Sequence, residues 1–243
     1  MDLPLTILRP AACELPLEKQ EVLRLLGYKP GVTRMDGRHD ALVDRGIALA
    51  AEAAAPVASI GYCGIIVRAG EVLTRMPGVI WRSRALARLL RGGVGVSLVA
   101  ATLGPGIDEL TARLFAGEEY ALATVVDAAG SALVQGLGRC VSAYLREQIQ
   151  GLTLTPLYGP GYGDWDIHDQ LGLVQAAGGP AIGLTNTAAC YLQPRKSLVG
   201  IVGWIVPAEG RRVPTTGCDL CTMKECAYRH RAPAHDHKED VQR

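Results

Sequence analysis

The sequence predicts an α+β protein built on an antiparallel sheet. Apolar runs with strand character are joined by short turns, and segments with helical periodicity lie between them. Hairpin connections favour an antiparallel sheet over a doubly wound parallel one. Hydrophobic residues make up 49% of the chain but aromatic residues only 5%. Alanine, leucine, valine and glycine must therefore fill the core, which implies close packing of backbones.

The first third of the chain begins with two predicted helices. Three prolines keep residues 1–16 extended, because proline removes a backbone donor and restricts φ. Residues 17–26 have a short apolar face, and Gly27 ends this helix. Asp36 is a suitable N-cap for a second helix that runs to about residue 55.

A hairpin and a capped helix follow. Residues 57–69 are rich in isoleucine, valine and tyrosine, which favour a strand. Residues 69–71, Ala-Gly-Glu, form a plausible turn into a second strand over 72–76. Ser83 is then the predicted N-cap of a helix that ends near Leu90.

This capped helix is strongly basic. Its surface carries Arg82, Arg84, Arg88 and Arg91. Such arginines usually form a solvated face, and the alternative is a contact surface.

A buried strand and a long helix come next. Residues 94–103 form an apolar run, and the Gly-Pro-Gly loop after it leads into a helix. We interpret this loop as an ordinary turn, with an anion site at the helix start as the alternative. Residues 118–150 form the longest helical pattern, with many alanines and glycines. The small residues indicate close packing, a kink or two helices. Asp127 within it is expected to face water, with a ligand contact as the alternative.

Residues 155–165 form the most distinctive segment. Its prolines and glycines exclude a helix or an inner strand, and so predict a shaped loop. Tyr158, Tyr162 and Trp165 lie within it. Bare backbone beside aromatic walls suits a flat, polar small molecule, and the alternative is a rigid turn covered by packed aromatic rings.

The remaining elements are shorter. Residues 167–177 read as a helix that a Gly-Gly-Pro sequence ends. Strands are predicted over 181–184, 188–192 and 198–206, and residues 193–196 form the turn before the last of them.

Three motifs together resemble the activation domain of vitamin B12-dependent methionine synthase, and especially short free-standing relatives of that domain. They are residues 159–164, the Pro-x-Lys-Ser turn at 194–197, and the cysteines after residue 217. The resemblance implies a single domain with a bent antiparallel sheet flanked by helices. We expect this domain to cover residues 1–207, and a short Cys/His-rich metal-binding tail to cover 208–243.

The resemblance also implies a ligand site. In that family the Pro-Gly-Tyr loop binds S-adenosylmethionine through backbone groups and the tyrosine. The corresponding candidates in this chain are Gly159, Pro160, Gly161, Tyr162 and, as a weaker contact, Asp164. One departure is visible: the family has an arginine five residues before the tyrosine, where it would meet the ligand carboxylate, and this chain has Leu157.

The tail contains the candidate metal ligands Cys218, Cys221 and Cys226. Cys-x2-Cys is half of a common metal site. Zinc with His230 as fourth ligand and an iron–sulfur cluster are both open, and the resemblance favours a redox role. The alternative is a disordered tail with incidental thiols.

The other four cysteines are scattered through apolar or mixed surroundings. They are Cys13, Cys63, Cys140 and Cys190, which we interpret as core thiols rather than parts of a disulfide framework.

Composition and charge narrow the partners. A net charge of +1 and few aromatic residues give little support to nucleic-acid binding through a zinc knuckle. No secretory signal is visible, and the long uncharged runs at 92–107 and 171–194 are interrupted by glycine and proline. We therefore expect a soluble, cytoplasmic protein without a membrane partner.

The functional hypothesis is an S-adenosylmethionine-binding reactivation partner of a corrinoid-dependent methyltransferase, supporting reductive methylation of cob(II)alamin. No cobalamin-binding domain is recognisable, so the cobalamin would be carried by a separate corrinoid protein or by a methionine synthase lacking its own activation domain. The alternative is a non-catalytic docking partner whose tail holds a structural zinc; Leu157 favours this alternative modestly.

Overall fold

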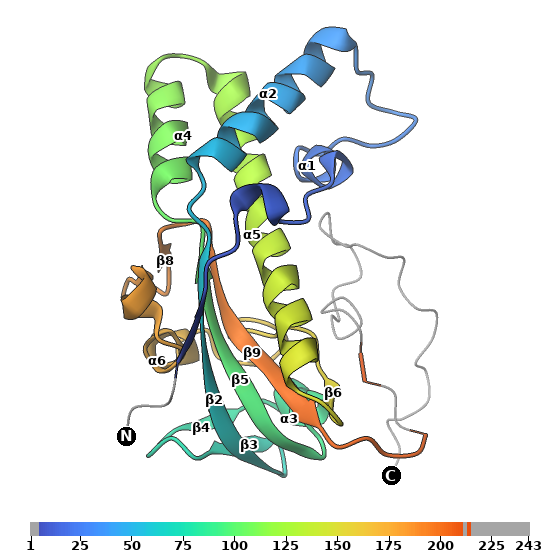
Figure 1. Ribbon diagram of the computed structural model, residues 1–243, viewed down its shortest axis with the longest axis vertical. Coiled ribbons are helices and arrows are strands. Elements are labelled where there is room, and N and C mark those ends of the chain that lie inside the picture. The colour runs from blue at the N-terminus through green and yellow to red at the C-terminus, as the bar shows by residue number, and fades with distance from the viewer. Residues whose placement is uncertain (1–4, 211–212, 215–243) are drawn as a thin grey trace.

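Every strand pairing among the described residues is antiparallel, which confirms the predicted fold class. The computed structural model describes residues 5–210 and 213–214. They form one α+β domain in which helices flank a seven-stranded sheet of order β4-β3-β2-β5-β9-β6, and β1 pairs beside β2 (Figure 1). Only residues 208–210 and 213–214 of the predicted tail are described. The boundary at residue 207 therefore stays a prediction.

The main sheet contains β1 (Thr6–Leu8), β2 (Val57–Arg68), β3 (Glu71–Thr74), β4 (Ile80–Arg82), β5 (Gly93–Thr102), β6 (Thr153–Leu154) and β9 (Ser197–Ile205). A separate two-stranded sheet contains β7 (Thr185–Asn186) and β8 (Leu192–Gln193). The helices are α1 (Lys19–Leu25), α2 (Gly37–Ala53), α3 (Arg84–Leu89), α4 (Gly106–Ala116), α5 (Tyr120–Gln148) and α6 (Asp169–Ala176).

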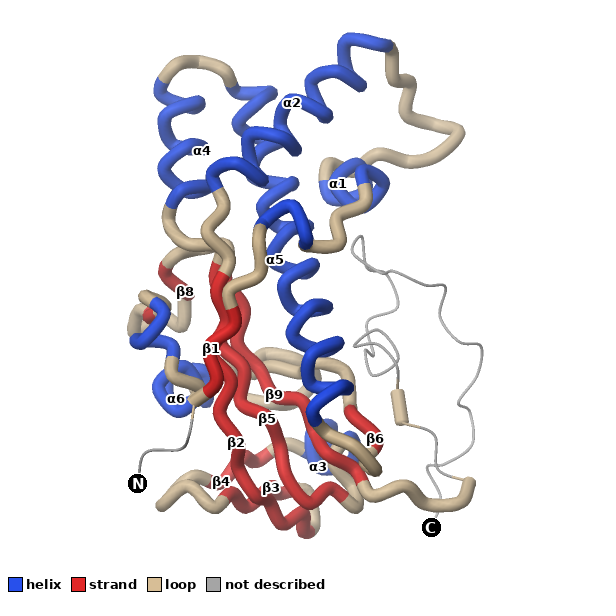
Figure 2. The backbone as a smooth tube through the Cα atoms, in the orientation of Figure 1, coloured by secondary structure: helices blue, strands red, loops and turns tan. Residues whose placement is uncertain are grey.

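The long strand β2 joins two parts of the sheet. Residues 57–64 pair with β5 on one edge, and residues 58–60 also pair with β1 on the other, whereas the last four residues pair with β3. Strands β2, β5 and β9 run side by side and curve along their length, so that β3 and β4 lie at one end of the molecule and α2 and α4 at the other (Figure 2). The sheet is therefore bent, as expected.

Both faces of the sheet are covered, because side chains alternate along each strand. Val99 and Ala101 of β5 pack with the core that α1, α2, α4 and α5 cover. Leu98 and Ala100 of the same strand pack with α3, α6 and the aromatic residues of the 155–165 loop. This double burial explains why β5 is a continuous apolar run in the sequence.

Helix α5 is a single helix of 29 residues, and its small residues have packing roles. A Cβ at Gly136 would lie 2.7 Å from the Pro16 carbonyl oxygen, and one at Gly130 would lie 2.9 Å from Ile107 Cγ2. By length and composition α5 could cross a membrane, but 67% of its most apolar window is buried inside the protein. The apolar character therefore serves the core.

The helix caps follow the sequence prediction closely. The Asp36 carboxylate accepts from the amides of Arg38 and His39 at the start of α2. The Ser83 hydroxyl accepts from the Leu86 amide at the start of α3. These caps act within three residues, so that the local sequence is sufficient to define them.

Two predicted strands are wrong. Residues 181–184 fall in and after a 3₁₀ turn, Gly179–Ile182, where Ile182 and Leu184 are buried below α6. Residues 188–192 are mainly a turn, and β-structure begins only at β8. In the first segment Ile182 and Leu184 are buried without being extended, whereas Ala188, Ala189 and Tyr191 of the second are exposed. A short apolar run does not by itself distinguish a strand from a turn.

Candidate functional site

The 158–165 loop is fastened to the middle of β9. The Tyr158 amide donates to the Ile201 carbonyl at 3.0 Å, and the Ile201 amide donates back to the Tyr158 carbonyl at 2.8 Å. The loop then closes on itself, because the Gly161 amide donates to the Trp165 carbonyl at 2.9 Å. Trp165 is buried, and its indole nitrogen donates to Asp169 at 2.8 Å. The loop is therefore a rigid platform.

Two glycines of the loop are required by its geometry. A Cβ at Gly159 would lie only 2.7 Å from the Val199 carbonyl oxygen, so the loop lies directly against β9. Gly161 has φ of +88°, a conformation that side chains disfavour. Between them Pro160 is buried. The predicted residues from Gly159 to Tyr162 thus form one contiguous, preorganised turn.

Tyr162 is the exposed side chain of this turn. It is 60% exposed, and its ring lies 5.6 Å from the buried Tyr158 ring. Its amide is already bonded to the Gly159 carbonyl at 3.2 Å. An aromatic face held open on a rigid loop can stack on a flat ligand at little entropic cost. The ring is consequently the group of this turn best placed to contact a ligand.

Asp164 has a different position from the one expected of a ligand contact. Its carboxylate accepts from the Ser83 hydroxyl at 2.5 Å and from the amides of Arg84 and Ala85 at 2.9 and 3.0 Å. These hydrogen bonds, led by that of Ser83, hold the pKa of Asp164 below its usual value. The carboxylate thereby joins the loop to the start of α3, a link for which the sequence contains no local signal.

Leu157 is half-buried and contacts other parts of the protein. A Cβ at Gly200 of β9 would be 3.3 Å from Leu157 Cδ1, and one at Gly138 of α5 would be 3.8 Å from Leu157 Cδ2. The side chain packs against the helical core. The position at which the resemblance implies an arginine is therefore an apolar contact between α5 and β9.

The Pro-x-Lys-Ser turn is the centre of a charge cluster. The ammonium of Lys196, whose side chain is only 8% exposed, lies 2.8 Å from Asp127 and donates to the Ser131 hydroxyl at 3.0 Å. Arg195 contacts Asp127 and Asp108 at 2.6 and 3.3 Å. Asp127 was expected to face water. Instead, its carboxylate pairs with Arg195 and Lys196 and fixes the turn to α5.

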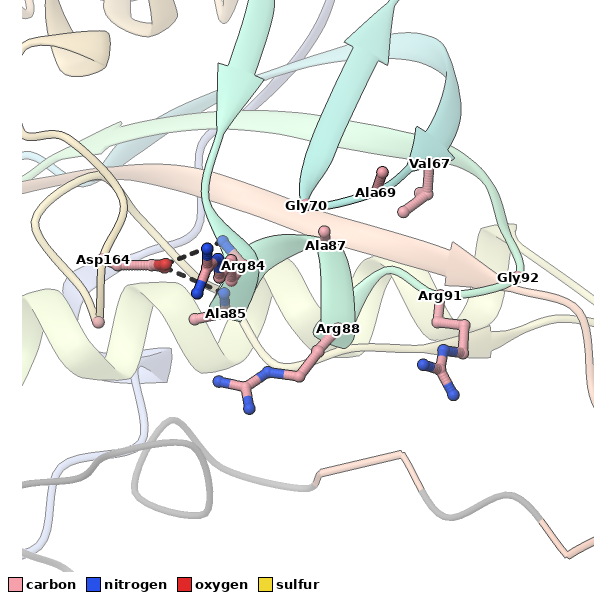
Figure 3. Close-up of a pocket in the computed structure, with 11 residues that line it drawn as sticks. Val67, Ala69, Gly70, Arg84, Ala85, Ala87, Arg88, Arg91, Gly92 and Asp164 are labelled. Atoms are coloured by element: carbon pink, nitrogen blue, oxygen red, sulfur yellow. Dashed lines mark hydrogen bonds between the residues drawn. The ribbon is translucent and has the colours of Figure 1, made fainter. Parts of the chain in front are cut away.

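A hollow of about 850 Å³ lies beside the loop, between α3 and the β2–β3 turn. Gly163 and Asp164 line it from the loop, and Arg84, Arg88 and Arg91 line it from α3 and the turn that follows (Figure 3). Tyr162 is not among its lining residues. The loop thus has an exposed aromatic face and, separately, an arginine-lined hollow.

The predicted metal ligands Cys218, Cys221 and Cys226 lie outside the described residues. In the part of the chain that is described, no three or more His, Cys, Asp or Glu side chains gather in a metal-binding group. Cys63 is buried, as expected of a core thiol, but Cys140 and Cys190 are only partly buried. Burial raises the pKa of the Cys140 thiol.

Comparison with known proteins identifies a solved structure with a similar fold. Neither a family model nor a curated protein matches the sequence. The structure is similar to the crystal structure of the MetH reactivation domain bound to AdoHcy, with a TM-score of 0.62 and 12% sequence identity. The similarity covers 87% of this chain and 81% of the other. The chain therefore shares the fold of that reactivation domain.

Proposed function

We propose that this chain binds S-adenosylmethionine and supports reactivation of a corrinoid-dependent methyltransferase. The observation that carries the proposal is the rigid turn from Gly159 to Tyr162, with its exposed ring, on the fold of a domain whose structure was solved with AdoHcy bound. AdoHcy is what remains of S-adenosylmethionine after its methyl group is transferred. The same site would hold both molecules.

In this proposal the chain contributes binding and orientation. The Tyr162 ring would stack on a flat part of the ligand. The amides of Gly161 and Tyr162 are bonded within the loop, so the loop keeps its shape when the ligand leaves. The bound corrinoid of a partner protein would supply the reactive cobalt, and an external donor the electron that reductive methylation requires. Holding the methyl group near that cobalt, away from water, is the work left to the protein.

The ligand's amino-acid end would be held weakly. Leu157 is packed between α5 and β9 and offers no positive charge to a carboxylate. We therefore expect 5′-methylthioadenosine, which lacks the amino-acid end, to bind about as tightly as AdoHcy. A charged hydrogen bond to the carboxylate would instead favour AdoHcy by about tenfold or more.

The activity is tested with a corrinoid protein in its cob(II)alamin form, a low-potential reductant and S-adenosylmethionine carrying a labelled methyl group. The wild-type chain should increase transfer of label to the corrinoid, and the Tyr162→Ala variant should not. Tyr191→Ala is the matched control, because Tyr191 is exposed, at 73%, and lies outside the loop. Equal transfer with and without the chain would contradict a reactivating role.

A docking role without catalysis is the second candidate. The apolar setting of Leu157 favours it, since a domain that only docks needs no cation for a ligand carboxylate. In that case the chain would form a complex with the corrinoid protein but bind neither AdoHcy nor 5′-methylthioadenosine. A structural zinc in the tail is part of this second proposal.

A further inference from the structure

We propose that the arginine pocket, the hollow lined by Arg84, Arg88, Arg91, Gly70, Gly163 and Asp164, binds the phosphate-bearing end of a small molecule. Its volume of about 850 Å³ is in the range of small-molecule sites. The hollow is much larger than a phosphate group, so the occupant has a body as well as a charged end. This pocket is separate from the site at which S-adenosylmethionine is proposed to stack on Tyr162.

The three arginines have no counter-ion among the described residues. None of their guanidinium groups lies within 4 Å of a carboxylate in that part of the chain, whereas Arg82 next to them pairs with Glu71. Arg84 and Arg88 are four residues apart on α3, where like charges repel each other. Arg91 follows in the turn after the helix. An anion in the pocket would relieve this repulsion.

Charge is also segregated along the sequence around the pocket. Residues 57–105 contain six arginines and a single acidic residue, Glu71, which gives this segment a net charge of +5 in a chain of net charge +1. The segment forms β2, β3, β4, α3 and β5, and the short elements among them gather at the end of the molecule where the pocket lies (Figure 1). Such a field attracts anions towards the pocket.

Asp164, the one carboxylate among the described residues that line the pocket, forms no ion pair with the three arginines, and the lining keeps a net charge of +2. Both carboxylate oxygens of Asp164 accept hydrogen bonds, from the Ser83 hydroxyl and from the amides of Arg84 and Ala85 (Figure 3). The hydrogen bonds that stabilise its charge come from the first two residues of α3 and from the N-cap Ser83. The same bonds hold Arg84 at the start of the helix, so that the loop positions one wall of the pocket.

The chemistry of the lining favours phosphate over a single carboxylate. Guanidinium groups form paired hydrogen bonds with phosphate oxygens, and three positive charges in one lining favour a ligand with two or more negative charges. Across the pocket from α3 the wall consists of Val67, Ala69 and Gly70, whose small side chains leave room for a ligand body. A phosphate or pyrophosphate group on an organic body fits this arrangement.

Calorimetry on the full chain tests the proposal with inorganic pyrophosphate, ADP, adenosine and citrate as probes. We expect pyrophosphate and ADP to bind and adenosine not to bind at this site. Replacing Arg88 or Arg91 by glutamine should weaken binding about tenfold or more, since a hydrogen bond to a charged group is lost. Both side chains are exposed, so neither change should disturb folding. Arg113→Gln is the control, because Arg113 is exposed on α4, away from the pocket.

The outcomes separate the sources of the anion. ADP binding more tightly than pyrophosphate, in a Tyr162→Ala background that removes stacking at the other site, would support a nucleotide-like ligand with a body held in the pocket. Equal binding would support recognition of the phosphate end alone. Citrate binding as tightly as pyrophosphate would contradict phosphate selectivity. Absence of pyrophosphate and ADP binding, or binding that Arg88→Gln and Arg91→Gln leave unchanged, would overturn the site. AdoHcy binding, measured in parallel, should be unaffected by either variant.

Discussion

The Asp164 carboxylate accepts a 2.5 Å hydrogen bond from the hydroxyl of Ser83, a residue 81 positions earlier in the chain. The same carboxylate bonds the first two amides of α3. Asp164→Asn should therefore destabilise the protein by about 1–2 kcal/mol, the usual effect of losing a helix-capping group. Urea unfolding at neutral pH measures this difference.

The pH dependence of protein stability gives a control for the capping role of Asp164. Because hydrogen bonding lowers the folded-state pKa of Asp164, its contribution is present above the ordinary carboxyl value of 3.8 and is lost as the pH falls through the lower folded value. The difference in the free energy of unfolding between wild type and Asp164→Asn should thus become smaller at acidic pH. Among the described residues, the Asp166 carboxylate bonds only to His168, two residues away. Asp166→Asn should therefore lower the free energy of unfolding at neutral pH by less than Asp164→Asn does. A gap that is constant with pH would contradict the capping role.

Lys196 should behave as a buried ion-pair partner. Its ammonium contacts Asp127 at 2.8 Å, and Arg195 contacts the same carboxylate. Lys196→Met keeps the apolar stem but removes the charge, which should cost about 1.5–3 kcal/mol. A double-mutant cycle with Asp127→Asn measures the coupling between the two residues. Additive effects would show that the pair does not hold the turn to α5.

Two glycine-to-alanine changes should have opposite effects. At Gly159 the new methyl group would meet the Val199 carbonyl at 2.7 Å, so the loop must shift and stability should fall by about 1–3 kcal/mol. At Gly172, in α6, no atom lies within 4 Å of the new methyl group, and alanine should stabilise the helix by about 0.5–1 kcal/mol. Thermal unfolding compares them, and a harmless Gly159→Ala would contradict close contact between loop and strand.

The tail cysteines should bind a metal. Anaerobic purification followed by a visible spectrum and iron, sulfide and zinc analysis should find bound metal that Cys221→Ser loses and Cys190→Ser retains. A brown protein with iron and sulfide would support electron transfer, and a colourless protein with zinc would support a structural tail. A wild-type chain free of metal would rule out both forms of the site.

Local signals explain what the sequence could predict. The Asp36 and Ser83 caps and the Ala69-Gly70 turn act on residues within a few positions, and the structure contains all three. Strands β4 and β6 were not predicted, since each has two or three residues and is extended only because a neighbouring strand pairs with it. Their existence depends on tertiary contacts rather than on their own residues.

In the candidate site, too, the features set by local sequence were predictable and those set by tertiary contacts were not. The shape of the 159–162 turn follows from its own glycines and proline, and was predictable. The roles of Asp164, Leu157 and Asp127 were not, because their contacts come from α3, β9 and the turn before β9 respectively. Asp164 was expected to contact a ligand, and the structure gives its carboxylate to the protein itself. Contacts between residues far apart in the chain leave no periodic pattern to read.

Calorimetric titration of AdoHcy into the wild-type chain and its Tyr162→Ala and Tyr191→Ala variants tests the central proposal most directly. We expect binding to the wild type, about a tenfold loss for Tyr162→Ala because base–aromatic stacking is removed, and no change for Tyr191→Ala. Absence of wild-type binding, or equal affinity in all three proteins, would contradict a ligand site on the 159–162 turn.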